Sequence, residues 1–249
     1  MTSKSNQSKH NTDQLICYIG VFLGGALLYL AAVLPFLLDH GGIFFYYGDY
    51  NVQQVPFYIM AHRAVREGRF FWTPYIDLGS SMGGSMSFYL WGSPFFWLTI
   101  PFDEKLVPYL LPFLMALRYG TALLTSYLYI SRHVKDRFWA VMGALLYTFS
   151  GFQAANIVFQ HFHDVTAFFP LYLLAFDELV QKKKTVGFIL MTALMSIINY
   201  YFFFGEVVFI VIYYLVRYAS RMRPGECAAQ IARIIPAGIA GLALAAFFL

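Results

Sequence analysis

The chain has 249 residues, of which 59% belong to the apolar set AVILMFWYC and only 12% are charged, and its net charge is +4. A typical soluble domain is about 45–50% apolar and about 25% charged, so this composition excludes a soluble domain. Nucleic-acid binding is excluded as well, because the basic residues form short clusters between apolar runs and no continuous stripe. Aromatic residues reach 20%, which is typical of proteins with many side chains at bilayer interfaces. The sequence therefore predicts an integral membrane protein whose first partner is the lipid bilayer.

The chain begins with a polar segment, residues 1–14, which we predict to be a disordered cytoplasmic tail. The uncharged run 15–38 follows. At 1.5 Å per residue this run exceeds the roughly 30 Å of a hydrocarbon core. A cleaved signal peptide would have an apolar region of only about 7–15 residues and then a small-residue cleavage site, which residues 35–38 do not provide. We interpret the run as a membrane anchor.

Residues 39–105 are expected to form the first extracytoplasmic loop of a transmembrane domain that covers residues 15–249. Pro56 fits the first turn of a helix, so the sequence predicts a helix from about Val55 that ends before Gly68. The loop is therefore expected to be partly helical.

The apolar stretch 88–102 lies at the end of this loop. It contains Pro94 and Pro101, which interrupt a regular spanning helix. We predict that it is a re-entrant or interfacial segment on the outer side.

Lysine and arginine fall in four short clusters, and these predict the orientation. The clusters are Lys4/Lys9, Arg132/Lys135/Arg137, Lys182–Lys184 and Arg217/Arg221/Arg223/Arg233. If all four are cytoplasmic, an even number of spans must separate consecutive clusters. The spans that satisfy this rule are residues 15–38, 106–130, 138–151, 165–180, 185–199 and 204–216, followed by a partial span from residue 234 that we interpret as truncated. The expected fold is an all-α, multi-pass bundle in the plasma membrane with the amino terminus inside.

In this topology, polar residues beside the spans collect on the outer side. They are Asp49, Gln53 and Gln54 after the first span, Asn156, His161, His163 and Asp164 in a predicted outer loop 152–164, and Asn199 and Glu206 around a hairpin turn. Ionisable groups at membrane depth are costly and indicate either a function or a paired structural role. Asp49 also fits a turn after Gly48, and Glu206 also fits an ion pair with Arg118.

Metal and phosphate binding remain open from the residues alone. His161 and His163 have a spacing that suits a loop metal site, but no third ligand is specified, so the cofactor is unknown, with a divalent cation as one option. Arg63 and Arg66 fit either an anionic ligand or a solvated basic helix face. No P-loop, G-x-S-x-G, H-E-x-x-H or dinucleotide motif is present. Enzyme and transporter are equally compatible with these residues.

Three segments carry a family resemblance. They are Gly48-Asp49 with Gln53 or Gln54, then Gly79 and Tyr89 to Phe95; Tyr147 to Phe152 with Asp164 and Pro170-Leu171; and Asn199-Tyr200-Tyr201 before the apolar run after Glu206. In their order and spacing these segments resemble the bacterial YfhO-like membrane proteins, which belong with the GT-C type of lipid-linked glycosyltransferases. Members usually carry an aromatic-Leu-Asp run where this chain has Phe162-His163-Asp164, so His163 has no counterpart in the family pattern.

The resemblance implies a GT-C-like fold with an acidic residue in the first outer loop that contacts the acceptor or assists its deprotonation. Asp49 occupies that position. The implied donor is a polyprenyl-phosphate-linked sugar, and the implied acceptor is a cell-surface glycopolymer such as lipoteichoic acid. Such a transfer needs a base at the acceptor hydroxyl and cationic stabilisation of the departing phosphate, which we expect from Arg63, Arg66 or a metal held with Asp164.

Two other classes of function are compatible with the same residues. A transporter or lipid flippase would use the outer polar residues as a vestibule and the hairpin 185–216 as discontinuous helices. A protein that only holds partners in the membrane would keep its function after the loss of Asp49.

Overall fold

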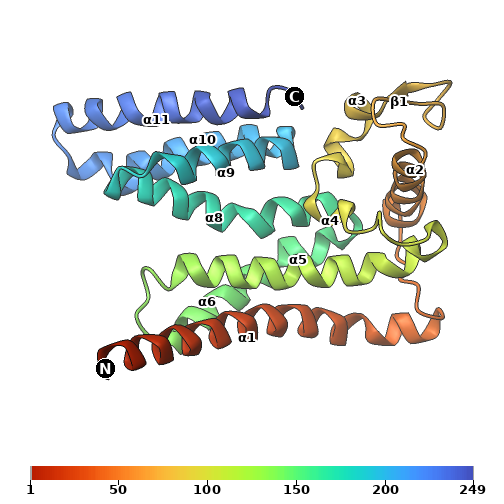
Figure 1. Ribbon diagram of the computed structural model, residues 1–249, viewed down its shortest axis with the longest axis horizontal. Helices are drawn as coiled ribbons and strands as arrows, with labels where there is room; N and C mark the ends of the chain where they lie inside the picture. Colours follow the sequence, from red (N-terminus) through yellow and green to blue (C-terminus); the bar gives the residue numbers. More distant parts are fainter. Residues whose placement is uncertain (1, 249) are drawn as a thin grey trace.

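The computed structural model describes residues 2–248 and is almost entirely helical. The helices of the main bundle lie roughly along one direction (Figure 1). They are α1 (Thr2–Asp39), α5 (Val107–Ile130), α6 (Arg137–Thr148), α8 (Gln160–Lys182), α9 (Thr185–Ile198), α10 (Tyr200–Arg217) and α11 (Pro224–Ala245). The all-α fold class predicted from the sequence is confirmed.

The bundle is arranged as a succession of packed helices. Helix α1 packs against α5, α5 packs against α6 and α8, α8 packs against α9, and α9 packs against α11. Within residues 2–248, five helical stretches are long and apolar enough to cross a membrane: Thr12–Asp39, Glu104–Ile130, Arg137–Val158, Tyr200–Arg221 and Pro224–Ala245. Helix α8 has polar residues near both ends and lies between α5 and α9, so its polar groups can be satisfied within the protein.

The two ends of the bundle differ in character. One end, called here the basic end, carries the α5–α6, α8–α9 and α10–α11 connections with Arg132, Lys182–Lys184 and Arg217–Arg223 (Figure 1). The opposite end, called here the loop end, carries the segment between α1 and α5 and the α9–α10 turn. This grouping of the basic connections agrees with the expectation that an even number of spans separates consecutive basic clusters. The assignment of the basic end to the cytoplasm stays a prediction.

The loop-end segment between α1 and α5 consists of short elements. They are η1 (Tyr50–Gln54), α2 (Val55–Arg66), β1 (Trp72–Thr73), β2 (Ser80–Ser81), α3 (Met82–Met86), η2 (Ser87–Trp91), α4 (Pro94–Trp97) and η3 (Glu104–Leu106), and β1 pairs with β2 in antiparallel fashion. The predicted helix from Val55, with Pro56 in its first turn, is confirmed as α2. The stretch 88–102 forms only short helical elements, as expected from its two prolines. Its place as a re-entrant or interfacial segment on the outer side stays a prediction.

Three sequence predictions of element bounds were wrong. Residues 2–14, predicted to be disordered, belong to α1, because adding a residue to an existing helix costs far less than nucleating one. Much of the predicted outer loop 152–164 is helical, since α7 (Gly151–Ala155) and η4 (Asn156–Val158) lead into α8. Helix α11 begins ahead of the predicted residue 234, because Pro224 fits its first turn and Glu226 accepts a hydrogen bond from the backbone N–H of Arg223 (3.1 Å).

Close packing of α1 on α5 depends on two glycines. A Cβ at Gly25 would lie 2.8 Å from the carbonyl oxygen of Tyr119, and a Cβ at Gly120 would lie 2.8 Å from that of Phe22. Small residues at such contacts let two membrane helices approach closely. A Cβ at the neighbouring Gly24 would meet nothing within 4 Å.

We therefore expect Gly25→Val to lower the free energy of unfolding by about 1–3 kcal/mol through overpacking, while Gly24→Val on the same helix leaves it nearly unchanged. The measurement is the thermal midpoint of the detergent-solubilised protein. Equal midpoints for the two variants would contradict this packing.

Candidate functional site

A buried ion pair joins α5 to α8 near the loop end. Arg118 lies within α5, and Asp164 lies in the second turn of α8. The Arg118 Nε donates to Asp164 Oδ1 at 2.5 Å, and the two side chains are only 0% and 1% exposed. Because a charge buried alone is strongly unfavourable, each of these groups depends on the other.

The remaining donors of Arg118 reach three other side chains. They donate to Gln160 Oε1 at 3.1 Å, to the Tyr58 hydroxyl at 2.7 Å and to Ser93 Oγ at 3.4 Å. The guanidinium carbon also lies 4.8 Å from the ring centre of Phe95. Burial raises the pKa of Tyr58 to about 12, so its hydroxyl stays neutral beside the arginine. One guanidinium thus connects α2, the start of α4, α5 and α8.

A second polar contact lies next to this network. The buried Gln54 at the end of η1 places its Oε1 3.4 Å from His161 Nδ1, and its amide nitrogen donates to Gln53 Oε1 at 3.2 Å. The His161 ring meets Phe88 and Tyr89 edge-on, with ring centres 4.9 and 5.4 Å apart. These contacts bring η1, η2 and the first turn of α8 together.

Asn199 fixes the α9–α10 turn to the same region. Its Oδ1 accepts from the Phe202 backbone N–H at 3.1 Å, which caps α10, and its Nδ2 donates to the Phe88 carbonyl at 2.9 Å. The buried Asn199 is therefore a structural link between the bundle and η2.

His161 and His163, whose spacing left a metal site open, point in different directions. His163 Nε2 lies 3.1 Å from the Asn156 carbonyl oxygen, and its ring packs on Tyr119 at 5.3 Å. His161 instead faces Gln54. Because both residues are helical, an i, i+2 spacing places them on different faces of α8. Among the described residues no group of three or more His, Cys, Asp or Glu side chains is placed to hold a metal ion.

The two arginines expected to meet a phosphate lie on the exposed face of α2. Arg63 is paired with Glu104 through two bonds, Nη2–Oε1 at 2.5 Å and Nε–Oε2 at 2.9 Å. Arg66 donates to the carbonyl oxygen of Ile100 at 3.1 Å. Both contacts dock α2 onto the segment that leads into α5. Neither arginine belongs to the Arg118 network.

Asp49 lies at the start of η1 at the loop end. It is exposed, and its side chain caps no backbone group. Gly48 before it adopts a φ of +58°, which glycine reaches without strain. Tyr50 after it is buried and meets Phe44 edge-on at 5.2 Å. A buried neighbour thus anchors the segment and leaves the Asp49 carboxylate in the open.

The predicted pairing of Glu206 with Arg118 was wrong. Glu206 is buried on α10, and neither of its carboxylate oxygens has a hydrogen-bond partner. The reason is helix order, because α5 packs against α8 whereas α10 packs against α9. Sequence reasoning found Arg118 as the one arginine deep in a span, but missed Tyr58, Ser93 and Gln160, whose polarity gives no signal of which helix they face.

A cavity of about 760 Å³ opens beside these elements. Its walls include Phe70, Phe71, Trp91 and Trp97 from the loop end and Ile197 from the end of α9. Large aromatic walls suit an apolar chain more than a charged group.

The Arg118–Asp164 pair allows a direct stability test. Arg118→Met and Asp164→Leu should each lower stability by about 3–5 kcal/mol, because each leaves one buried charge without its partner. The double variant should be clearly less destabilised than the sum of the single variants, as judged by thermal midpoints in detergent. Additive losses would show that the two side chains are not coupled.

Comparison with known proteins identifies one family for this chain. The family model described as "Bacterial membrane protein YfhO" matches residues 21–249. No curated protein and no solved structure gives a significant match. The matched residues include every helix from α2 to α11, the buried Arg118–Asp164 pair and the loop-end segment. The chain belongs to the YfhO family of bacterial membrane proteins.

Proposed function

We propose that this protein is a membrane glycosyltransferase that moves a sugar from a polyprenyl-phosphate donor to a cell-surface glycopolymer at the loop end of the bundle. The observation that carries the proposal is the exposure of the Asp49 carboxylate. This carboxylate lies just before η1, in the loop that follows α1 and where the GT-C resemblance places the acid that contacts the acceptor.

The other acidic candidate of the loop end is less suited to act as a base. Asp164 is 1% exposed and bonded to Arg118, so an acceptor hydroxyl has no access to it. A general base must come within hydrogen-bond reach of the proton that it removes. Asp49 meets this requirement because its carboxylate is open to an incoming acceptor. Gln53, half-buried in η1 and hydrogen-bonded to Gln54, is proposed to contact the substrate.

The donor's two parts fit two features of the loop end. Its polyprenyl chain suits the aromatic cavity lined by Phe71, Trp91 and Trp97. Its phosphate needs cationic stabilisation. Arg66 is better placed for this role than Arg63, because Arg63 is already paired with Glu104 through two bonds, whereas Arg66 bonds only a backbone carbonyl. Under this proposal the loop end faces outward and the basic end faces the cytoplasm.

Replacement of Asp49 by Asn should lower sugar transfer by about 10²–10⁴-fold, the usual contribution of a positioned general base. Asp77→Asn is the matched control, since Asp77 is another exposed acid of the same loop and its φ of +49° is one that Asn tolerates. The measurement follows label from a radiolabelled polyprenyl-phosphate sugar into surface polymer in membranes that contain the full-length protein.

Two results would overturn the proposal. Equal labelling of polymer by wild type and Asp49→Asn would reduce Asp49 to a turn residue. If wild type transfers no label while the lipid-linked sugar still changes leaflet, the protein is a flippase.

A further inference from the structure

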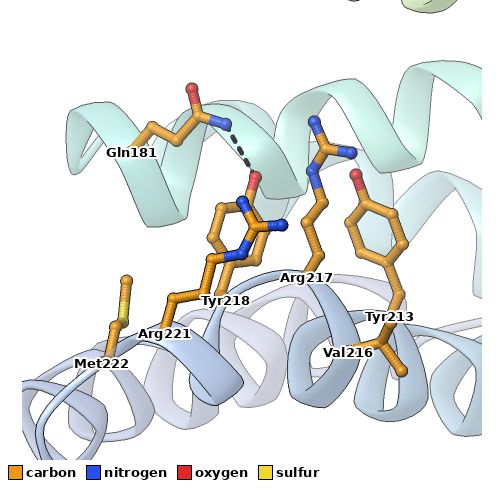
Figure 2. Close-up of a pocket in the computed structure, with 7 residues that line it drawn as sticks. All are labelled: Gln181, Tyr213, Val216, Arg217, Tyr218, Arg221 and Met222. Atoms are coloured by element: carbon orange, nitrogen blue, oxygen red, sulfur yellow. Dashed lines mark hydrogen bonds between the residues drawn. The ribbon is translucent and has the colours of Figure 1, made fainter.

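A second polar site lies at the basic end, far along the bundle from the loop end. A cavity of about 630 Å³ opens between the last turns of α8 and of α10 and is lined by Gln181, Tyr213, Arg217, Tyr218 and Arg221, among others. Figure 2 shows that Tyr213 and Arg217 of α10, and Tyr218 directly after it, project toward α8. An adjoining cavity of about 350 Å³ shares Gln181 and Arg217. Both cavities therefore open around one guanidinium.

The carboxylate nearest to this cavity is already satisfied by tyrosines. Asp177 on α8 accepts hydrogen bonds from the Tyr218 hydroxyl at 2.6 Å and from the Tyr213 hydroxyl at 2.9 Å. Gln181 donates to the Tyr218 oxygen at 2.7 Å. These bonds hold the rings of Tyr213 and Tyr218 in place as one wall of the cavity.

The guanidinium of Arg217 packs on these two tyrosine rings. Its guanidinium carbon lies 5.6 Å from the ring centre of Tyr213 and 5.9 Å from that of Tyr218. Its Nη2 lies 3.1 Å from the Nδ1 of His133. Burial and the charge of Arg217 lower the pKa of His133, so the imidazole is neutral and can accept this hydrogen bond. The arginine is thus oriented by uncharged groups.

The positive charge at this site exceeds the acid available. Within the part of the chain that the structure describes, Arg217 and Arg221 form no ion pair with a carboxylate. The other acid, Glu178, is shared by Arg132, Lys182 and Lys184 at 3.5, 3.1 and 3.7 Å. Two guanidinium groups four residues apart are therefore left with donors for an anion.

The side chains around the cavity favour an anion that also carries apolar chains. Val216 and Met222 also line the cavity, and the apolar side chains of Ile212, Leu215 and Val216 on α10 are more than half exposed, at 55%, 54% and 71%. Planar guanidinium groups bind phosphate through paired hydrogen bonds. Basic pockets between membrane helices bind the head groups of anionic lipids.

We propose that the cavity at the basic end binds the phosphate of an anionic phospholipid head group through Arg217 and Arg221, while the acyl chains lie against the exposed apolar face of α10. This site is independent of sugar transfer at the loop end and uses none of its residues.

The test measures binding of phosphatidylglycerol to the purified full chain in detergent by native mass spectrometry, with phosphatidylcholine as the neutral lipid. Arg217→Gln/Arg221→Gln should bind phosphatidylglycerol about 100-fold more weakly than wild type, because each substitution removes at least one charge-assisted hydrogen bond worth about tenfold in affinity. Lys135→Gln/Arg137→Gln is the matched control, because it removes two exposed charges from the same end outside both cavities. It should change the affinity by less than about twofold.

Further variants and a competition experiment complete the test. Arg217→Lys/Arg221→Lys should recover only part of the affinity, since lysine lacks the planar fork. If the double glutamine variant fails to fold, the single variant Arg221→Gln tests the proposal instead. Arg221 is exposed, so its replacement does not disturb the packing of the bundle. Wild-type affinity in these glutamine variants, or an equal loss in the control, would overturn the proposal. Displacement of the lipid by inorganic phosphate alone would also overturn it and would identify free phosphate as the ligand.

Discussion

The guanidinium of Arg118 is the interaction on which the loop end depends. A charge this deep in a membrane bundle is tolerated only when it has an oppositely charged partner and further hydrogen-bond acceptors. Asp164, Gln160, Tyr58 and Ser93 supply those acceptors, and they come from three different segments. The requirement to satisfy one side chain therefore holds α2, the start of α4, α5 and α8 in a fixed arrangement. The Gln54–His161 contact next to it lies between elements that this arrangement positions.

The two ends of the bundle use charge in different ways. At the loop end Arg118 and Asp164 neutralise each other in the core, whereas the carboxylate of Asp49 is exposed. At the basic end Asp177 is bonded by tyrosines, and Arg217 and Arg221 form no ion pair with a carboxylate among the described residues. One end is thus suited to a reaction on an uncharged hydroxyl, and the other is suited to holding an anion. The two proposals rest on this difference and not on a shared residue.

The sequence predicted much of the fold and little of the site. Apolar runs, Pro56 and the basic clusters are local signals, and they predicted most of the long helices, the start of α2 and the grouping at the basic end. The partner of Arg118 could not be predicted, because Asp164 and Glu206 are equally plausible until the helix order is known. Likewise, the histidine pair reads as a loop metal site until α8 is seen to begin at Gln160.

The central claim is that the loop end binds the lipid-linked donor. The most direct measurement is photo-crosslinking of the full-length protein in membranes with a polyprenyl phosphate that carries a diazirine next to the phosphate, followed by mass spectrometry of the labelled peptides. We expect labelled peptides from residues 66–100 and from the α9–α10 turn at Asn199. Labelling that concentrates at the basic end, around Arg132 and Arg217, would contradict it.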